Sequence, residues 1–176
     1  MTNFPLINIF KGRSDSLTTK IRKLNTNSNS KILIYMTSHG GNNFLRIRTK
    51  SVILSDELNR TFWEMYLKQR YKEILFILDT CEAVTAFDAV TAPNIFFVGS
   101  SLKDQKALSY GFDEVLMTPL SDRFTFLFSH FLDNILHQRK FEYSIKDFFD
   151  QVSVHKDFLN SEIGIKNRIV RDVISN

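Results

Sequence analysis

Two short apolar runs constrain the fold of this chain more than any other feature. The first, Lys31 to Thr37, reads KILIYMT, and the second, Ile74 to Thr80, reads ILFILDT. Runs of this length, rich in β-branched and aromatic residues and nearly free of charge, are typical of buried parallel strands with helices on both faces. We therefore expect an α/β domain built on a mostly parallel sheet.

Each of these runs leads into a residue that can do chemistry. His39 follows the first run within the sequence Ser-His-Gly-Gly, and Cys81 follows the second run directly. Ligands of open α/β sheets bind beyond the carboxyl ends of the strands. If a single right-handed crossover joins the two strands, His39 and Cys81 lie on the same rim, on neighbouring strands. Cys81 is the only cysteine, so no disulfide within the chain can occupy its sulfur.

Helical periodicity and turn residues predict the other central elements. A helix is expected to begin at Ser55 as N-cap and to end near Arg70, because its apolar positions share one face. A short helical stretch, Ala83 to Val90, precedes a third strand, Ile95 to Val98. Beyond it, Ser101 to Thr118 reads as irregular, and Ser121 is expected to cap a long helix that ends near His137.

The two ends of the chain give weaker patterns. Pro5 to Phe10 reads as the end of a helix or a short strand, and residues 12–30 have the Ser, Thr, Asn and Lys content of a mobile surface loop. Ile145 to Val152 is consistent with a helix, and Asn167 to Ile174 with a closing strand.

Length and composition bound the class of protein. A chain of 176 residues with 43% hydrophobic residues and 17 phenylalanines is long enough for one globular domain with a substantial core. No apolar run reaches the roughly 18 to 20 residues that span a bilayer, and the sequence from Met1 lacks the features of a secretory signal. The net charge of +4 is scattered, so we expect no nucleic-acid surface.

His39 and Cys81 together have the chemistry of a cysteine peptidase. A nearby imidazole favours the thiolate, which is the reactive form of cysteine. Gly40 has no side chain, so its N–H can approach a developing oxyanion, and the N–H of Cys81 is the natural second donor. Taken singly, Cys81 could be a small buried hydrophobe and His39 an ordinary loop histidine. Their positions at two strand ends favour the catalytic interpretation.

Longer motifs around the pair are specific to one family. The separation of 42 residues between His39 and Cys81 fits a caspase-like arrangement. Two long segments surround the pair, Ile34-Tyr-Met-Thr-Ser-His-Gly-Gly-Asn-Asn-Phe-Leu and Arg70-Tyr-Lys-Glu-Ile-Leu-Phe-Ile-Leu-Asp-Thr-Cys-Glu-Ala. Shorter matching segments are Pro93-Asn-Ile, Gly99-Ser-Ser, Leu108-Ser-Tyr and Ser121-Asp-Arg-Phe-Thr-Phe, and the match as a whole extends from roughly Asn8 to Phe149. These segments resemble the family of GPI-anchor transamidase catalytic subunits. That family is related to legumain-type asparaginyl endopeptidases and has a caspase-like three-layer fold.

The resemblance implies a reaction and a set of roles. Cys81 would attack the acceptor carbonyl of a precursor protein, and the resulting thioester would pass to the ethanolamine amine of a GPI lipid. His39 would manage protons, and Gly40 and Cys81 would hold the oxyanion. By the same resemblance, Asp79, Ser109 and Asp122 line the substrate pocket. Alternatively, Asp79 only accepts backbone N–H bonds at its strand end, and Asp122 only serves the dipole of the next helix.

The resemblance also implies a setting for this reaction. It places the chain on the lumenal side of a membrane complex in the endoplasmic reticulum, with other subunits as partners and without a cofactor. The remaining histidines, His130, His137 and His155, have no acid or cysteine at a metal-ligand spacing, so we expect no metal site.

Three departures from the family keep alternatives open. The match begins inside the family's catalytic domain, so the N-terminal strands of the fold are not expected, and strand 31–37 would be an exposed edge. A secretory signal and a membrane-spanning tail are not found. Glu82 stands where the transamidases carry glutamine, which is closer to legumain.

These departures leave several interpretations open. The chain is either a fragment or a mis-started gene product, or a reduced protein whose sheet a partner completes; in both cases we expect the isolated chain to have little activity. A legumain-like asparaginyl endopeptidase and a noncatalytic interaction subunit are the alternative functions.

Overall fold

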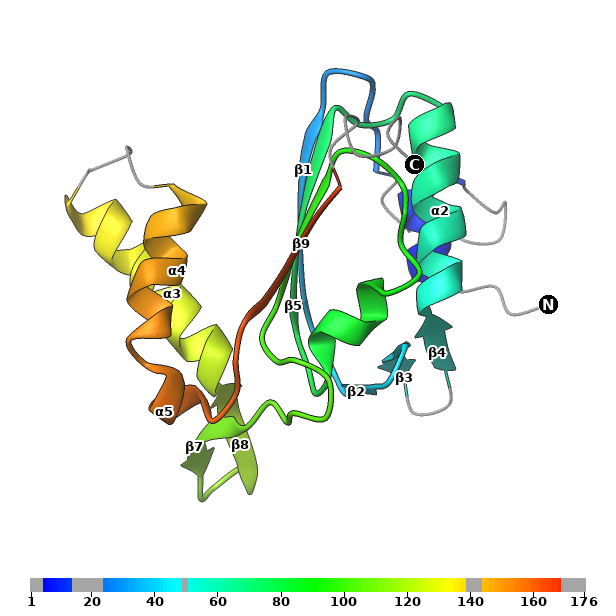
Figure 1. Cartoon of the computed structure of the whole chain (residues 1–176). Helices are drawn as coiled ribbons and strands as arrows, with labels where there is room; N and C mark the ends of the chain where they lie inside the picture. The colour runs from blue at the N-terminus through cyan, green and yellow to red at the C-terminus, as the bar shows by residue number, and fades with distance from the viewer. Residues whose placement is uncertain (1–4, 14–23, 49–50, 139–143, 169–176) are drawn as a thin grey trace.

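A four-stranded sheet forms the centre of the molecule (Figure 1). The computed structural model describes residues 5–13, 24–48, 51–138 and 144–168. The strand order is β1-β5-β6-β9, and the strands are β1 (Lys31–Thr37), β5 (Glu73–Asp79), β6 (Ile95–Gly99) and β9 (Gly164–Arg168). The first three strands are parallel, and β9 runs antiparallel to β6. The mostly parallel α/β sheet expected from the apolar runs is confirmed.

Strands β1 and β5 are neighbours and pair in a continuous register. Lys31 lies opposite Glu73 at one end, and Thr37 lies opposite Asp79 at the other. The prediction that the histidine strand and the cysteine strand adjoin is therefore confirmed. β1 is also a terminal strand of this sheet in the described part of the chain, as predicted.

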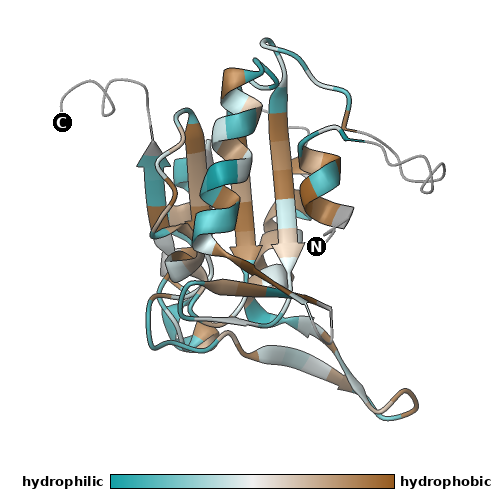
Figure 2. Ribbon diagram, turned by 90° about the vertical axis from the view of Figure 1, so that its right-hand side faces the viewer, coloured by the Kyte–Doolittle hydropathy of each residue, from teal (hydrophilic) through white to brown (hydrophobic). Residues whose placement is uncertain are grey.

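Helices cover both faces of the sheet and give a three-layer arrangement. Figure 1 places α1 (Pro5–Phe10) and α2 (Ser55–Leu67) on one side, and α3 (Arg123–Gln138), α4 (Ile145–Ser153) and α5 (Lys156–Leu159) on the other. A short 3₁₀ helix, η1 (Ala83–Phe87), follows β5 on the α2 side. The parallel strands are strongly apolar along their length, as Figure 2 shows, and β5 and β6 are largely buried on both faces.

Alternate residues of the strands supply two separate cores, since successive side chains point to opposite faces. On the α2 side, the strands meet buried residues of the helices, namely Phe10, Leu58, Phe62, Met65 and Phe87. On the other side, they meet Phe124, Phe131, Phe148, Val152 and Leu159. In β5, Phe76 belongs to the first core and Ile77 to the second. This alternation explains why the sequence of β5 is apolar without interruption.

Two smaller sheets flank the carboxyl ends of the parallel strands. β2 (Gly40–Gly41), β3 (Phe44–Arg48) and β4 (Ser51–Leu54) form an antiparallel sheet between β1 and α2. β7 (Ser109–Asp113) and β8 (Thr118–Asp122) form a hairpin that projects from the end of the molecule (Figure 1).

The β7–β8 hairpin corrects the expectation that Ser101 to Thr118 is irregular. Its turn contains no glycine or asparagine at the position with a positive φ, where Met117 has φ 52°. The Oδ1 atom of Asp113 instead accepts hydrogen bonds from the N–H groups of Val115 and Leu116, each at 2.8 Å. An aspartate that closes a turn in this way is a weaker sequence signal than an Asn-Gly or Asp-Gly pair.

Both expected helix caps were also wrong. Ser55 lies inside the first turn of α2, and its hydroxyl accepts a hydrogen bond from the N–H of Ala89 at 2.9 Å instead of capping the helix. Helix α3 begins at Arg123, and Ser121 belongs to strand β8. In both cases a contact from a distant part of the chain replaces the local cap that the sequence suggested.

The other predicted elements agree with the structure apart from their boundaries. α1 and α4 are helical, and the closing strand β9 begins three residues earlier than expected. Residues 169–174 of that predicted strand lie outside the described residues. Of the predicted loop 12–30, residues 14–23 also lie outside them, and its mobility stays a prediction. In the described part, Asn27 closes a turn by accepting the N–H groups of Asn29 and Ser30.

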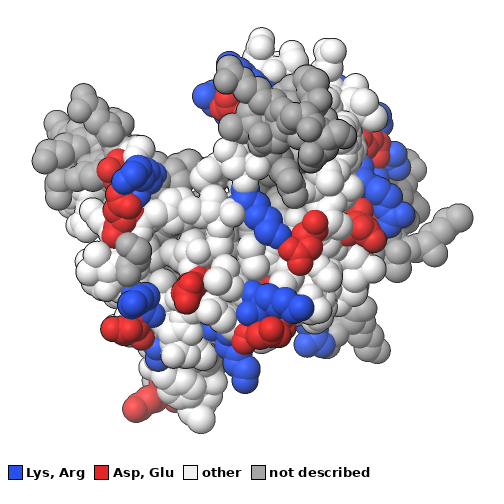
Figure 3. Space-filling model, in the orientation of Figure 1, with Lys and Arg blue, Asp and Glu red and all other residues white. Residues whose placement is uncertain are grey.

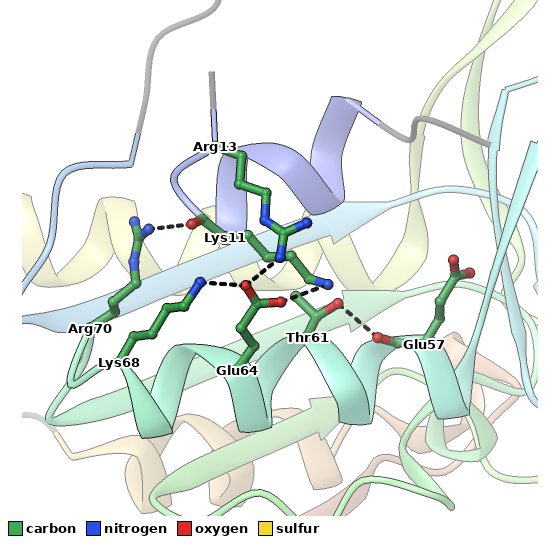
Figure 4. Close-up of polar contacts among 7 residues, drawn as sticks. All are labelled: Lys11, Arg13, Glu57, Thr61, Glu64, Lys68 and Arg70. Atoms are coloured by element: carbon green, nitrogen blue, oxygen red, sulfur yellow. Dashed lines mark hydrogen bonds and ion pairs between the residues drawn. The ribbon is translucent and has the colours of Figure 1, made fainter. Parts of the chain in front are cut away.

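An ion cluster fixes the N-terminal segment to α2 (Figure 4). The carboxylate of Glu64 contacts Lys11 at 2.9 Å, Arg13 at 2.7 Å and Lys68 at 2.6 Å. Arg70 donates to the backbone carbonyls of Lys11 and Leu24. Partial burial raises the pKa of Glu64, but hydrogen bonds from Lys68, Lys11 and Arg13 outweigh this effect and bring the pKa down to about 2. The cluster joins segments that are more than fifty residues apart in sequence.

Candidate functional site

The register of β1 and β5 brings His39 and Cys81 to the same rim of the sheet. Thr37 and Asp79 are the last paired residues, and each candidate catalytic residue lies two positions beyond its strand. The N–H of Ser38 donates to the carbonyl of Asp79 at 3.2 Å, so the chain segments that leave the two strands start side by side. His39 is exposed and Cys81 is partly buried.

Gly40 lets the histidine loop approach the cysteine loop closely. A Cβ atom at Gly40 would lie 2.6 Å from Oγ1 and 2.9 Å from Cγ2 of Thr80, the residue that precedes Cys81. Contacts this short do not occur between real side chains, and Thr80 is buried and has little room to move. Glycine after His39 is therefore required for the two loops to pack as they do.

The segment after Cys81 is held in a strained turn. Glu82 has a left-handed backbone with φ 50°, which costs a residue with a side chain of the order of 1 kcal/mol. Its N–H donates to the carbonyl of Gln105 at 2.9 Å, and the N–H of Asp104 donates to its carboxylate at 3.4 Å. The thiol of Cys81 points to the carbonyl of Ala107, with 3.9 Å between sulfur and oxygen.

Ser100 and Ser101 hold the same turn from the next strand. The N–H of Thr80 donates to the hydroxyl of Ser100 at 3.2 Å, and the N–H of Ala83 donates to that of Ser101 at 3.0 Å. The hydroxyl of Ser101 donates in turn to the carbonyl of Thr80 at 2.7 Å. The supporting role of these residues and of Gln105 was not predicted from the sequence. The Gly-Ser-Ser run after a predicted strand was the one available signal.

Asp79 is fully buried and is tied to the start of helix α3. Its Oδ2 atom accepts hydrogen bonds from the N–H of Thr125 at 3.1 Å and from the hydroxyl of Thr125 at 2.7 Å. This contact satisfies one of the free N–H groups in the first turn of α3, which explains how that helix begins without a cap from Ser121. Burial raises the pKa of Asp79, and hydrogen bonds from Thr125 and Ser100 offset part of that rise.

Tyr35 extends this network on the outer strand. Its hydroxyl lies 2.7 Å from Oγ1 of Thr125. Because the proton of Thr125 goes to Asp79, Tyr35 is the donor, and the three groups form one directed chain of hydrogen bonds. Burial is the largest effect on Tyr35 and raises its pKa to about 12, so it stays protonated at neutral pH.

The other two predicted pocket residues lie opposite each other at the base of the hairpin. Ser109 begins β7 and pairs with Asp122, which ends β8. The hydroxyl of Thr37 donates to Asp122 at 3.0 Å and so joins the hairpin to the end of β1. An open pocket of about 300 Å³ lies here, lined by Thr37, Pro119, Leu120, Ser121, Asp122 and Thr125. Asp122 lines this pocket directly, Asp79 lies behind Thr125, and Ser109 is exposed beside Asp122.

None of the other histidines lies on the two strand ends that lead to His39 and Cys81. His130 stacks on Phe126 with ring centroids 5.8 Å apart, Nδ1 of His137 lies 2.7 Å from the carbonyl of Asp133, and His155 precedes α5. Among the described residues, no group of three or more His, Cys, Asp and Glu side chains is placed to hold a metal ion.

A three-layer α/β domain with a histidine and a cysteine at adjacent strand ends defines the cysteine-peptidase type of enzyme. The profile of the Peptidase C13 family matches residues 1–175 of the chain. The chain belongs to the Peptidase C13 family.

Within this family, the chain is similar to curated proteins named GPI-anchor transamidase. The chain is 37% identical over 147 residues to the GPI-anchor transamidase of Saccharomyces cerevisiae, an alignment that covers 84% of this chain and 35% of the yeast protein. It is 38% identical to the GPI-anchor transamidase of Bos taurus and 37% identical to that of Homo sapiens, each over 129 residues. Each of those two alignments covers 73% of this chain and 33% of the relative. The chain thus spans about a third of the length of the relatives it matches. No helix among the described residues is long and apolar enough to cross a membrane.

Proposed function

We propose that this chain carries the catalytic pair of a GPI-anchor transamidase, with Cys81 as nucleophile and His39 as general base and acid. The observation that carries the proposal is the register of β1 and β5, which sends both residues to one rim in a chain 37% identical to a named transamidase. Family membership supports the cysteine-peptidase chemistry, and the names of the relatives support transfer to a GPI lipid.

The reaction divides into two acyl transfers. His39 takes the proton of the Cys81 thiol, and the sulfur attacks the acceptor carbonyl of the precursor to form a tetrahedral oxyanion. The N–H groups of Gly40 and Cys81 donate to that oxyanion. His39 then returns the proton to the nitrogen of the leaving C-terminal peptide, and a thioester remains on Cys81.

The second transfer repeats these steps with a different nucleophile. The ethanolamine amine of the GPI lipid attacks the thioester while His39 accepts its proton. The new amide forms as the Cys81 sulfur leaves, and His39 gives the proton back to that sulfur. Both steps balance without a cofactor, because neither changes an oxidation state.

Asp122, Ser109 and Asp79 would form the acceptor-residue pocket next to this pair. Asp122 lines the open pocket at the end of β1, which ends two residues before His39. Asp79 would act through Thr125, whose hydrogen bonds it receives, rather than by direct contact with substrate.

The proposed setting follows from the relatives. The substrates would be precursor proteins with a C-terminal GPI signal and the GPI lipid itself, and the partners would be other subunits of a membrane complex. The site of action would be the lumenal side of the endoplasmic reticulum membrane.

Glu82 gives no separate support to the legumain-like alternative. Its backbone N–H and its carboxylate brace the loop that contains Asp104 and Gln105, and a glutamine could make the same contacts through its side-chain carbonyl oxygen.

Complementation tests the proposal directly. In cells depleted of their own transamidase, the chain assembled in its native complex should restore a GPI-anchored surface reporter. Cys81→Ala and His39→Ala should each reduce anchoring by at least about 10⁴-fold, since residues that act as one catalytic unit cannot substitute for each other. His130→Ala, a change at another exposed histidine, should have no effect. Full anchoring by Cys81→Ala would overturn the proposal.

A small amine separates transamidase from endopeptidase. With hydrazine added to the native complex, a transamidase should release precursor that carries a hydrazide at its new C-terminus. An endopeptidase would release mainly the free acid, and that result would assign the chain to hydrolysis.

A further inference from the structure

The tip of the β7–β8 hairpin exposes consecutive large apolar side chains. Val115 is 90% exposed, Leu116 69% and Met117 74%. Phe112 and Leu120, on the two strands below the turn, are also exposed. Val115, Leu116 and Met117 are consecutive and together form an exposed apolar surface at the tip, and exposed apolar surfaces can mark interaction sites.

The turn that carries this patch is held in one conformation. Asp113 accepts two backbone hydrogen bonds inside the turn, and Met117 occupies a left-handed conformation that is costly for a residue with a side chain. A flexible turn would have no need of either feature. The tip is therefore preorganised, which lowers the entropic cost of binding a partner.

Aromatic contacts anchor the other end of the hairpin to the domain. The ring of Tyr110 lies 4.4 Å from that of Phe126 in α3 and 5.2 Å from that of Phe158 in α5, measured between centroids. Arg123 donates to the carbonyl of Phe158 at 2.6 Å and lies over its ring. With its base fixed in this way, the hairpin projects from the end of the molecule, as Figure 1 shows.

The charges near the tip indicate the kind of partner. Between Lys106 and Arg123, the only charged residues are the acids Asp113, Glu114 and Asp122. Figure 3 shows the end of the hairpin as a mainly uncharged surface with acidic and no basic side chains at its tip. Anionic membrane surfaces attract Lys and Arg, so an acid-flanked tip is poorly suited to them. A protein surface with an apolar pocket and a basic rim complements it in both respects.

We propose that the hairpin tip, residues 112–117, is a binding site for another protein subunit. The side chains of Val115, Leu116 and Met117 would insert into an apolar pocket of that subunit, and Lys or Arg residues would line the rim of the pocket. This proposal does not depend on the proposed enzymatic function, since the tip contains none of the residues assigned to the reaction.

Photo-crosslinking from the tip tests this proposal. A photoreactive benzoylphenylalanine at Val115, in the chain expressed in its native complex, should crosslink to one polypeptide at one segment that combines apolar residues with Lys or Arg. The double variant Leu116→Ser with Met117→Asn should reduce the yield about tenfold or more, as expected when a hot spot is removed. Asparagine tolerates the left-handed conformation, so this variant should keep its melting temperature.

Three further variants test the specificity of this crosslink. Leu67→Ser with Val154→Thr changes two equally exposed apolar residues elsewhere and should leave the crosslink intact. Glu114→Lys should weaken it, because it places a positive charge against the basic rim. Cys81→Ala should give the same crosslink as the unchanged chain, so failure of the enzymatic proposal would not be mistaken for failure of this one.

Other occupants give distinct outcomes. The purified chain is mixed with phosphatidylcholine vesicles, or with vesicles that contain phosphatidylserine. If the chain floats with them and the tip variant does not, the partner is a membrane and not a protein. A crosslink to a second copy of the chain would replace it by self-association. Crosslinks that are scattered, or that the tip variant leaves unchanged, would overturn the proposal.

Discussion

Thr80 and Gly40 control the distance between the two reactive loops. The hydroxyl and methyl groups of Thr80 fill the space that a side chain at position 40 would need. We expect Gly40→Ala to push the His39 loop away from Cys81, to lower the free energy of unfolding by about 1–3 kcal/mol and to reduce thioester formation more than 100-fold. Chemical denaturation and trapping of the Cys81 thioester in the native complex measure these two effects.

A compensating change tests the cause of that loss. Thr80→Ala removes the two atoms closest to a Cβ at position 40 and leaves the backbone oxygen of Phe44 at 3.1 Å. The double variant Gly40→Ala with Thr80→Ala should therefore recover most of the stability and activity that Gly40→Ala loses. If the double variant is as inactive as Gly40→Ala, steric crowding by Thr80 is not the reason for glycine.

Thr125 determines how costly the buried charge of Asp79 is. Burial raises the folded-state pKa of Asp79 above its ordinary value of 3.8, so the folded state binds this proton more tightly than the unfolded state. Stability from this residue is therefore greatest at low pH and is lost as pH rises through the raised pKa. Thr125→Val removes one donor to the carboxylate and should destabilise the chain by about 1–3 kcal/mol at pH 7 and by less at pH 4.

Unfolding by urea at the two pH values measures the effect of this substitution. Thr125→Ser keeps the hydroxyl and should behave like the unchanged chain at both. An equal loss for Thr125→Val at pH 4 and pH 7 would mean that the hydrogen bond between the hydroxyls of Thr125 and Tyr35, and not the charge of Asp79, dominates.

Among the elements, the ion cluster on α2 determines how firmly α1 is held. The unfolded pKa of Glu64 is 4.5 and the folded pKa is about 2, so its contribution is fully present above pH 4.5 and is lost as pH falls toward 2. Glu64→Gln should increase hydrogen exchange of the α1 backbone amides at pH 6 and have little effect near pH 2. Glu73→Gln, which breaks a more exposed pair with Lys31, should change exchange very little at either pH.

Among the elements, the strands of the central sheet were far more predictable from the sequence than the β7–β8 hairpin. β5 is a continuous apolar run because both of its faces are covered, and β1 has a similar run although Leu33 is exposed; the short length and β-branched residues of both runs favour strands over a helix. The hairpin instead exposes its apolar residues and turns at Met117, so neither alternation nor glycine marked it. The caps expected at Ser55 and Ser121 failed because the partners of these helix ends come from residues that only the fold brings near.

The candidate site also has one part that the sequence predicts and another part that it does not. The positions of His39 and Cys81 followed from strand ends, which the sequence locates well. The braces around Cys81, such as Gln105 and Ser101, depend on backbone carbonyls and hydroxyls of a loop, and no local pattern specifies them.

For the molecule as a whole, the β1 side of the sheet is one place where a further strand can pair. β1 is one of the two terminal strands among the described residues, β9 being the other, and Leu33 is 64% exposed on β1. Unprotected edge strands pair with other chains. We expect the purified chain to associate with increasing concentration and Leu33→Lys to reduce that association, as measured by analytical ultracentrifugation. Leu67→Lys, at an equally exposed position on α2, should not reduce it, and if it does, general surface apolarity is responsible instead.

The position of β1 has a further consequence for how the proposed catalytic pair would respond to heating. Cys81 follows a strand with neighbours on both sides, whereas His39 follows a strand that pairs on one side only among the described residues. Edge strands open by local fluctuations that leave the rest of a domain folded. On warming, the histidine would therefore leave the cysteine before the core melts, so inactivation would precede global unfolding and would reverse on cooling.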